Sequence, residues 1–264
     1  KPLRDYTKVI QYCDEVKADG FDLVDDFSDL FGMNAAGTDA KMRNTKESIL
    51  EAQFTSGAGN WCTWMFGRDL VNWNNNFTWA KWVTPSRDLI SAFKQEGDEV
   101  RFKESIVYYD CNWSNYYPSD NYPFMYKCRS ANSSIIKYRY ADVLLLKAEA
   151  LIMQDTPDLE GAADIIDEVR DRAKLGALPT SVRSNKNVLL NALLKERRLE
   201  LAFEGQRWFD LVRLDKVEEV MNAVYAKDSG RKAQIYTFDK NSYRLPIPQS
   251  VIDANDKIHQ NPGY

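Results

Sequence analysis

Residues 138–153 read YRYADVLLLKAEALIM and carry the clearest structural signal in the chain. When it is wound as an α-helix, apolar side chains lie on nearly every face, because Val143 to Leu146 and Ala150 to Ile152 form two dense apolar runs. A helix that is apolar almost all round is buried in the core of its protein. The sequence therefore predicts a buried helix over this stretch.

Amphipathic helices follow this stretch toward the C-terminus. Apolar side chains over 159–173 share one helical face until Gly176, and Thr156 is the expected N-cap with a proline at the first helical position. Further helices are predicted over 187–204 and 206–224. Two antiparallel helices joined by a short turn resemble a tetratricopeptide-like hairpin.

Helical signals are fewer in the first half of the chain. Residues 3–17 and 86–95 keep helical apolar spacing, the second with Ser86 as N-cap. Over 47–54 the periodicity does not decide between a strand and a helical turn. The proline-containing residues 240–264 are expected to form an extended tail. No segment shows a strong strand ladder, so the predicted fold class is mostly α.

Tryptophan and tyrosine are concentrated in residues 61–126, which hold six of the 7 Trp and six of the 14 Tyr. They lie in two stretches of irregular pattern, 57–82 and 108–126, among Gly, Asn, Ser and Asp. One interpretation is packing in the core. The other is a binding surface, on which rings contact the C–H faces of a sugar and polar groups bind its hydroxyls; a peptide could use the same surface. The candidate ligand-binding residues are Trp61, Trp64, Trp73, Asn75, Trp79, Trp113, Tyr116 and Tyr117.

The segment 195–213 reads KERRLELAFEGQRWFDLVR and carries a regular charge pattern. Glu196, Glu200 and Glu204 recur every four residues, so they stack on one helix face and repel unless cations interleave. Paired carboxylates could perform acid–base catalysis, but a glycosidase acid and base flank a sugar across a cleft rather than stack along one helix. We therefore favour a structural ion network that joins two helices across Gly205. Its expected members are Glu196, Arg197, Glu200, Glu204, Arg207, Asp210 and Arg213.

Bulk composition excludes several classes of protein. The net charge of −4 and the absence of a long basic run argue against a nucleic-acid partner. No apolar stretch is long enough to span a bilayer. Four cysteines without a CxxC pair, together with a single histidine, predict no metal site, no cofactor and no nucleophile–base set. Cys111 and Cys128 flank an aromatic loop and are either paired or free thiols.

Three motifs occur in order along the second half of the chain. They are YRYADVLLLKAEA at 138–150, the charged segment from Glu196 to Arg213, and the closing YRLPIP at 243–248 with QNPGY at 260–264. Together they resemble the C-terminal part of the SusD/RagB family of nutrient-binding outer-membrane lipoproteins of Bacteroidetes. The resemblance implies a SusD-like fold with tetratricopeptide-like helix pairs and long irregular ligand-binding loops.

The resemblance also implies one domain over the whole chain, residues 1–264. Within it we expect a helical entry at 1–56, a loop-rich aromatic region at 57–137, and a helical scaffold with an extended tail at 138–264. The chain is then the C-terminal portion of a longer protein.

The function implied by the resemblance is capture, not catalysis. A surface-exposed lipoprotein of the cell outer membrane would bind an oligosaccharide and deliver it to a SusC-type TonB-dependent transporter. Its N-terminal lipid anchor would lie outside this chain. Peptide capture within the same family and a transporter-associated helical scaffold without a glycan site remain alternatives. A glycoside hydrolase that uses Glu196 or Glu200 is the least favoured.

Overall fold

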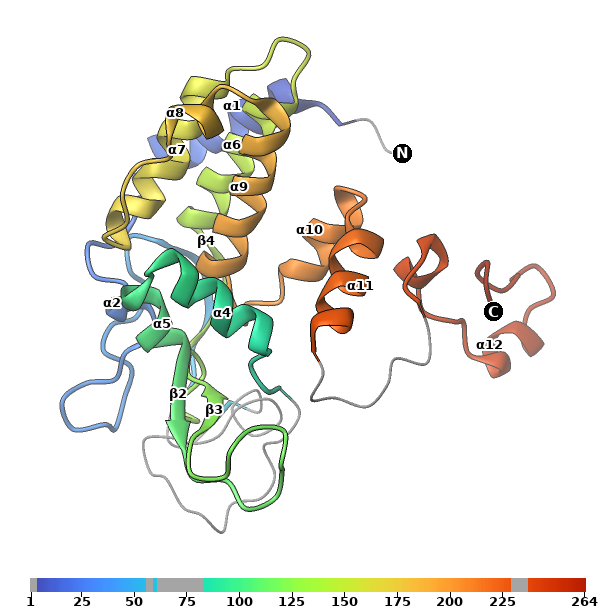
Figure 1. Ribbon diagram of the computed structural model, residues 1–264, viewed down its shortest axis with the longest axis horizontal. Coiled ribbons are helices and arrows are strands. Elements are labelled where there is room, and N and C mark those ends of the chain that lie inside the picture. The colour runs from blue at the N-terminus through green and yellow to red at the C-terminus, as the bar shows by residue number, and fades with distance from the viewer. Residues whose placement is uncertain (1–3, 56–58, 61–82, 229–236) are drawn as a thin grey trace. The chain divides into compact units, whose positions relative to one another are not determined.

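The described part of the chain is mainly helical. A computed structural model describes residues 4–55, 59–60, 83–228 and 237–264. The chain divides into two compact units, residues 1–205 and residues 206–264. Helices dominate the described residues of both units, and four short strands lie in the first (Figure 1). The predicted mostly α fold class is confirmed, and the single domain expected from the resemblance stays a prediction.

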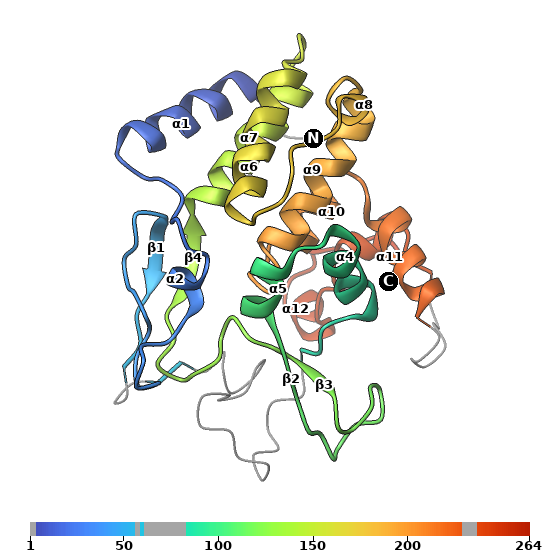
Figure 2. The same ribbon diagram turned by 60° about the vertical axis from the view of Figure 1, so that its left-hand side comes forward.

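The centre of the first unit is helix α6 (Tyr140–Met153). It packs against α1 (Tyr6–Ala18), α7 (Leu159–Arg172) and α9 (Lys186–Glu200), which Figures 1 and 2 show gathered around it. Its side chains are buried on several faces, and Leu145 has no exposed surface. The predicted buried helix is confirmed.

Helix α7 has the predicted apolar face but a different N-cap. Its buried face includes Ala162, Ile166 and Val169. The cap is Asp158, whose carboxylate accepts the backbone N–H of the first turn with an O···N distance of 2.9 Å, so the prediction of Thr156 was wrong. Aspartate is a stronger N-cap than threonine, and it lies directly before the first apolar position of the stripe.

Shorter helices complete the first unit. Helix α4 (Arg87–Glu96) begins where predicted, and the Ser86 hydroxyl accepts a first-turn backbone N–H at 3.1 Å. Helix α5 (Glu99–Ser105) follows it and was not predicted. Two single helical turns are α2 (Ser28–Phe31) and α8 (Thr180–Arg183).

The strands form two separate antiparallel pairs. Strand β1 (Ser48–Ala52) pairs with β4 (Ile135–Arg139), which decides the undecided segment in favour of a strand. Strand β2 (Ile106–Tyr109) pairs with β3 (Tyr122–Met125) in a hairpin. The expectation of an irregular stretch over 108–126 was therefore wrong at both ends. Four-residue strands are too short to show a period, although β-branched and aromatic residues favour them.

Helix α9 ends at Glu200, four residues before its predicted end. Phe203 and Gly205 both have positive φ angles, of 66° and 83°, so the chain leaves the helical conformation before the glycine. The predicted stop at Gly205 was therefore late by one turn. As a result, Glu204 lies beyond the helix rather than on its face.

The described residues of the second unit form four short helical elements, which are α10 (Arg207–Arg213), α11 (Val217–Lys227), η1 (Lys240–Tyr243) and α12 (Gln249–Asp253). The single helix expected over 206–224 is thus two helices. Asp215 adopts a φ of 59°, and the next backbone N–H bonds back to the Leu211 carbonyl at 2.8 Å, which ends α10. The tail expected to be extended contains the last two elements.

Candidate functional site

The predicted ligand-binding residues fall into two groups. Trp113, Tyr116 and Tyr117 lie on the connection between β2 and β3. The others lie outside the described residues: Trp61, Trp64, Trp73, Asn75 and Trp79.

The β2–β3 hairpin carries its own small aromatic core. Cys111, Tyr122 and Phe124 are buried, and the half-buried rings of the connection pack against them. The backbone N–H of Cys111 donates to the Ser119 carbonyl at 2.6 Å, which joins the two ends of the connection. The loop is therefore attached to the hairpin by side-chain packing and by its backbone.

The three predicted rings pack against neighbouring rings of this core. The Trp113 and Phe124 centroids are 6.0 Å apart. Tyr116 and Tyr117 meet edge to face at 4.8 Å, and Tyr117 meets Tyr122 in the same way at 5.5 Å. All three predicted residues are half-buried, so each combines a packing role with some accessible surface.

Arg87, the first residue of α4, supports the two tyrosines. Its guanidinium carbon lies 3.9 Å from the Tyr116 ring centroid and 4.9 Å from that of Tyr117, and the guanidinium also donates to the Tyr116 carbonyl. The Tyr117 hydroxyl donates to the Pro85 carbonyl at 2.7 Å. Cation–π contacts and hydrogen bonds thus fix both rings. Their role in binding a ligand stays a prediction.

The cysteines that flank this loop do not form a disulfide with each other. Cys111 is buried and Cys128 is half-buried, and neither sulfur is part of a disulfide bond. Of the two possibilities that the sequence left open, the structure has the thiols.

The three predicted glutamates belong to a buried ion cluster. Glu200 has no exposed side-chain surface and contacts Arg101 at 3.0 Å as well as Arg139 and Arg172. Glu196 and Glu204 bind further cations of the same cluster. We call this set the Glu200 cluster; among the described residues its five carboxylates and five cations are Glu47, Asp98, Arg101, Lys127, Arg139, Arg170, Arg172, Glu196, Glu200 and Glu204. At its edge Arg170 also contacts Glu96 at 2.7 Å, and Glu96 in turn pairs with Lys195.

Several elements of the first unit meet in the Glu200 cluster. Arg101 of α5 bridges two successive turns of α9, with 2.5 Å to Glu196 and 3.0 Å to Glu200. Arg139, the last residue of β4, contacts Glu47 at 2.7 Å, and Arg172, the last residue of α7, contacts it at 2.8 Å. The cluster therefore connects α5, α7, α9 and β4. Equal numbers of opposite charges make its burial possible.

The pKa values within the cluster reflect competition between burial and neighbouring charges. Burial opposes the ionisation of Glu200, but Arg172, Arg139 and Arg101 outweigh it and hold the pKa of Glu200 well below its ordinary value. For Glu196 burial prevails and raises the pKa, although Arg101 opposes it. Burial lowers the pKa of Lys127 to about 8, against the opposing effect of Glu204.

The remaining residues expected in the network lie elsewhere. Arg197 contacts Asp142 of α6 at 2.7 Å. In the second unit Arg207 begins α10, and Asp210 and Arg213 pair within that helix at 2.8 Å. Sequence reasoning missed the cations that contact the three glutamates, since Arg101, Lys127, Arg139, Arg170 and Arg172 all lie outside the charged segment.

This arrangement offers no catalytic pair at the charged helix. The side chain of Glu196 is 2% exposed and that of Glu200 is 0% exposed, and both are bound by arginines. A glycosidase needs a carboxylic acid and a second carboxylate facing a sugar. Neither glutamate can contact a sugar from solvent in this structure.

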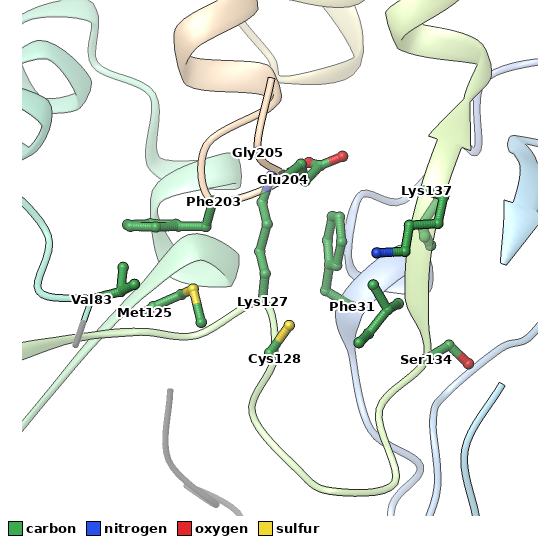
Figure 3. Close-up of a pocket in the computed structure, with 12 residues that line it drawn as sticks. Phe31, Val83, Met125, Lys127, Cys128, Ser134, Lys137, Phe203, Glu204 and Gly205 are labelled. Atoms are coloured by element: carbon green, nitrogen blue, oxygen red, sulfur yellow. Dashed lines mark hydrogen bonds and ion pairs between the residues drawn. The ribbon is translucent and has the colours of Figure 1, made fainter. Parts of the chain in front are cut away.

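A pocket that the sequence did not predict lies within the first unit. Its volume is about 380 Å³, and its apolar wall consists of Phe31, Val83, Met125, Ile135, Ile136 and Phe203. Figure 3 shows the Lys127 side chain extending toward Glu204, and the Lys137 side chain reaching in from β4. The pocket combines an apolar interior with two ammonium groups.

Two features are absent from the described residues. None of the helices in that part of the chain has the length and apolar character needed to cross a membrane. The same residues contain no group of three or more His, Cys, Asp or Glu side chains arranged to hold a metal ion.

Comparison with known proteins identifies the family. The family model described as the SusD family matches residues 117–264, more than half of the chain. The chain belongs to the SusD family. The resemblance predicted from the three motifs is confirmed.

Two curated SusD-family relatives come from Formosa agariphila. SusD-like protein P38 is 43% identical over 99 residues, which cover 35% of this chain and 19% of that protein. SusD-like protein P2 is 36% identical over 143 residues, which cover 52% of this chain and 27% of that protein. The matched part of the chain thus spans less than a third of either relative.

A solved structure shows the same fold. Surface glycan-binding protein A from Bacteroides thetaiotaomicron, in complex with laminarihexaose, superposes with a TM-score of 0.72 at 20% identity. The match covers 97% of this chain and 59% of that one. The predicted SusD-like fold is therefore confirmed over nearly all of the chain.

Proposed function

We propose that this chain is part of a non-enzymatic protein that binds an oligosaccharide at the cell surface. The observation that carries the proposal is membership of the SusD family, whose fold this chain shares with a neighbour solved in complex with laminarihexaose. The aromatic-rich residues 61–126 supply the side chains that sugar binding needs.

The described rings fit this role through their rigidity. Trp113, Tyr116 and Tyr117 are half-buried, so each is held on one side while retaining accessible surface. Rings fixed before binding lose little conformational entropy when a sugar stacks on them. We therefore propose that the hairpin connection forms one part of a stacking surface, with the tryptophans of 61–82 as further candidates.

The test is calorimetry or affinity electrophoresis against a panel of plant, host and microbial glycans. We expect at least one glycan to bind, and Trp113→Ala to weaken its binding by up to about tenfold, because an aromatic ring in a stacked contact contributes about 0.5–1.5 kcal/mol. Trp73→Ala tests the residues outside the described part of the chain. Trp113→Phe keeps an aromatic face and should retain most of the affinity.

A matched control is Tyr12→Ala, which removes an exposed ring from α1. Its glycan affinity should equal that of the wild type. Glycan affinity that is unchanged in both Trp113→Ala and Trp73→Ala would contradict the proposed surface. Binding of peptides but of no glycan would favour peptide capture, and release of a product from any glycan would refute the non-enzymatic assignment.

We further propose that the whole protein is a lipid-anchored outer-membrane protein that passes its ligand to a SusC-type TonB-dependent transporter. Co-purification of the full-length protein with the transporter encoded beside it tests the partnership. If the full-length protein forms a complex with the transporter but binds no glycan, the helical-scaffold alternative is favoured.

A further inference from the structure

The pocket in the first unit has the dimensions and the lining of a small-molecule site. Ligand pockets enclose about 300–1,000 Å³ and are lined mainly by apolar side chains with a few polar groups. This pocket encloses about 380 Å³. Phe31, Met125 and Ile136 are buried side chains of the surrounding core, so the wall is built into the fold.

Most polar side chains of the pocket are already bound to protein groups. Lys127 donates to the Glu200 carbonyl at 2.8 Å and to Glu204 at 2.5 Å. Glu204 also accepts two hydrogen bonds from Arg139, at 2.7 and 2.8 Å. Lys127 and Glu204 therefore neutralise each other and have little capacity left for a ligand.

Ser134 is engaged as well, since its hydroxyl lies 2.7 Å from Nη1 of Arg43, which donates to it. A bare sugar ring would have to place several hydroxyls in this pocket without partners. A buried hydroxyl without a hydrogen bond costs about 1–3 kcal/mol. The lining therefore disfavours a sugar and favours a hydrocarbon body.

Lys137 is the exception among the polar groups of the pocket. Its side chain extends from β4 toward the cavity in Figure 3. Within the part of the chain that the structure describes, its ammonium makes no hydrogen bond or ion pair. A carboxylate placed there would gain a charge-assisted hydrogen bond.

We propose that this pocket binds an amphipathic carboxylate, whose apolar body lies against Phe31, Met125 and Phe203 and whose carboxylate pairs with Lys137. The site is separate from the aromatic connection of the β2–β3 hairpin and does not depend on the proposed glycan binding. Among the described lining residues, Lys137 is the cation without a hydrogen-bond or ion-pair partner, so it selects one anionic group, and the apolar wall selects a hydrocarbon.

The experiment compares octanoate with its neutral isostere octanamide by calorimetry on the full chain. Octanoate should bind one to one, and octanamide should bind about fivefold more weakly, the effect expected for one solvent-accessible ion pair. Lys137→Gln should reduce the affinity for octanoate to that level and leave octanamide unaffected. Lys186→Gln is the matched control, because Lys186 is an exposed lysine of the same unit that does not line the pocket.

A second measurement locates the ligand without a variant. Cys128 lines the pocket and Cys111 does not, so bound octanoate should slow alkylation of Cys128 while leaving that of buried Cys111 unchanged, as measured by peptide mass spectrometry.

A third experiment blocks the site. Val83→Trp should fill the pocket and abolish octanoate binding.

Three results would overturn the proposal. They are no octanoate binding at millimolar concentration, equal affinity for octanoate and octanamide, and binding that survives Val83→Trp without protecting Cys128. Glycan binding and octanoate binding are measured separately on the same protein. Failure of one proposal therefore does not imply failure of the other.

Discussion

Glu200 shows what a single buried charge requires of its surroundings. It contacts three arginines contributed by α5, β4 and α7 and has no access to water. The cost of removing such charges from water offsets much of their attraction, so the intact cluster adds little net stability. Removing one member is different, because the opposite charges then remain buried without compensation.

We therefore expect Glu200→Gln to lower the free energy of unfolding by about 3–5 kcal/mol, as measured by urea denaturation. Glu160→Gln is the matched control, since Glu160 pairs with Arg183 but its side chain is 72% exposed. The control should change stability by no more than about 1 kcal/mol. A similar effect from both substitutions would contradict the structural role of the cluster.

The same residue predicts a pH dependence. The pKa of Glu200 is lowered on folding, so its contribution is fully present above the ordinary glutamate pKa of about 4.3 and is lost as the pH falls toward the folded value. The difference in unfolding free energy between wild type and Glu200→Gln should be constant above about pH 5.5 and then shrink by up to about 1.4 kcal/mol per pH unit. Denaturation series from neutral to acidic pH measure it. A difference that stays constant into acid would show that the pKa of Glu200 is not lowered on folding.

At the scale of the element, local sequence signals predict helices better than they predict where helices begin and end. The apolar stripe of α7 was predicted correctly, but its N-cap is Asp158 rather than Thr156. Helix α9 ends at Glu200, and Asp215 separates α10 from α11. The end of a helix depends on the backbone angles of single residues. The periodicity of apolar residues carries no information about these angles.

The two candidate caps can be separated by substitution. Asp158→Ala should destabilise the protein by about 1 kcal/mol, because a first-turn N–H of α7 loses its acceptor. Thr156→Ala should change stability by less than about 0.5 kcal/mol. Thermal or chemical denaturation of both variants decides the matter, and a larger loss from Thr156→Ala would reassign the cap.

At the scale of the whole molecule, the described helices of the two units differ in how many of their residues are buried. Helix α6 contributes nine buried residues to the first unit, whereas Val217 is the buried residue of α11 in the second. Local opening is easier where fewer apolar contacts are lost. The units should therefore differ in their local stability.

Native-state hydrogen exchange measures this difference directly. Amides of α6 should exchange at least about tenfold more slowly than those of α11 under the same conditions. Comparable protection in both helices would show that the second unit is as stable as the first.

The features that depend on neighbours along the chain could be predicted from the sequence. Residues 138–153 predicted a buried helix, Ser86 predicted the start of α4, and three ordered motifs predicted the SusD family. Each of these sequence signals is either local or a fixed order of motifs along the chain. It can therefore be recognised without knowledge of the tertiary contacts.

Which charges pair, and where a cavity forms, became known from the folded structure. Arg101 lies 99 residues from Glu200, and Arg139 lies 61 residues from it, so no spacing in the charged segment indicated either contact. The pocket likewise combines residues from Phe31 to Gly205. Burial brings such distant groups together, and their pairing follows from the shared need to neutralise charge away from water.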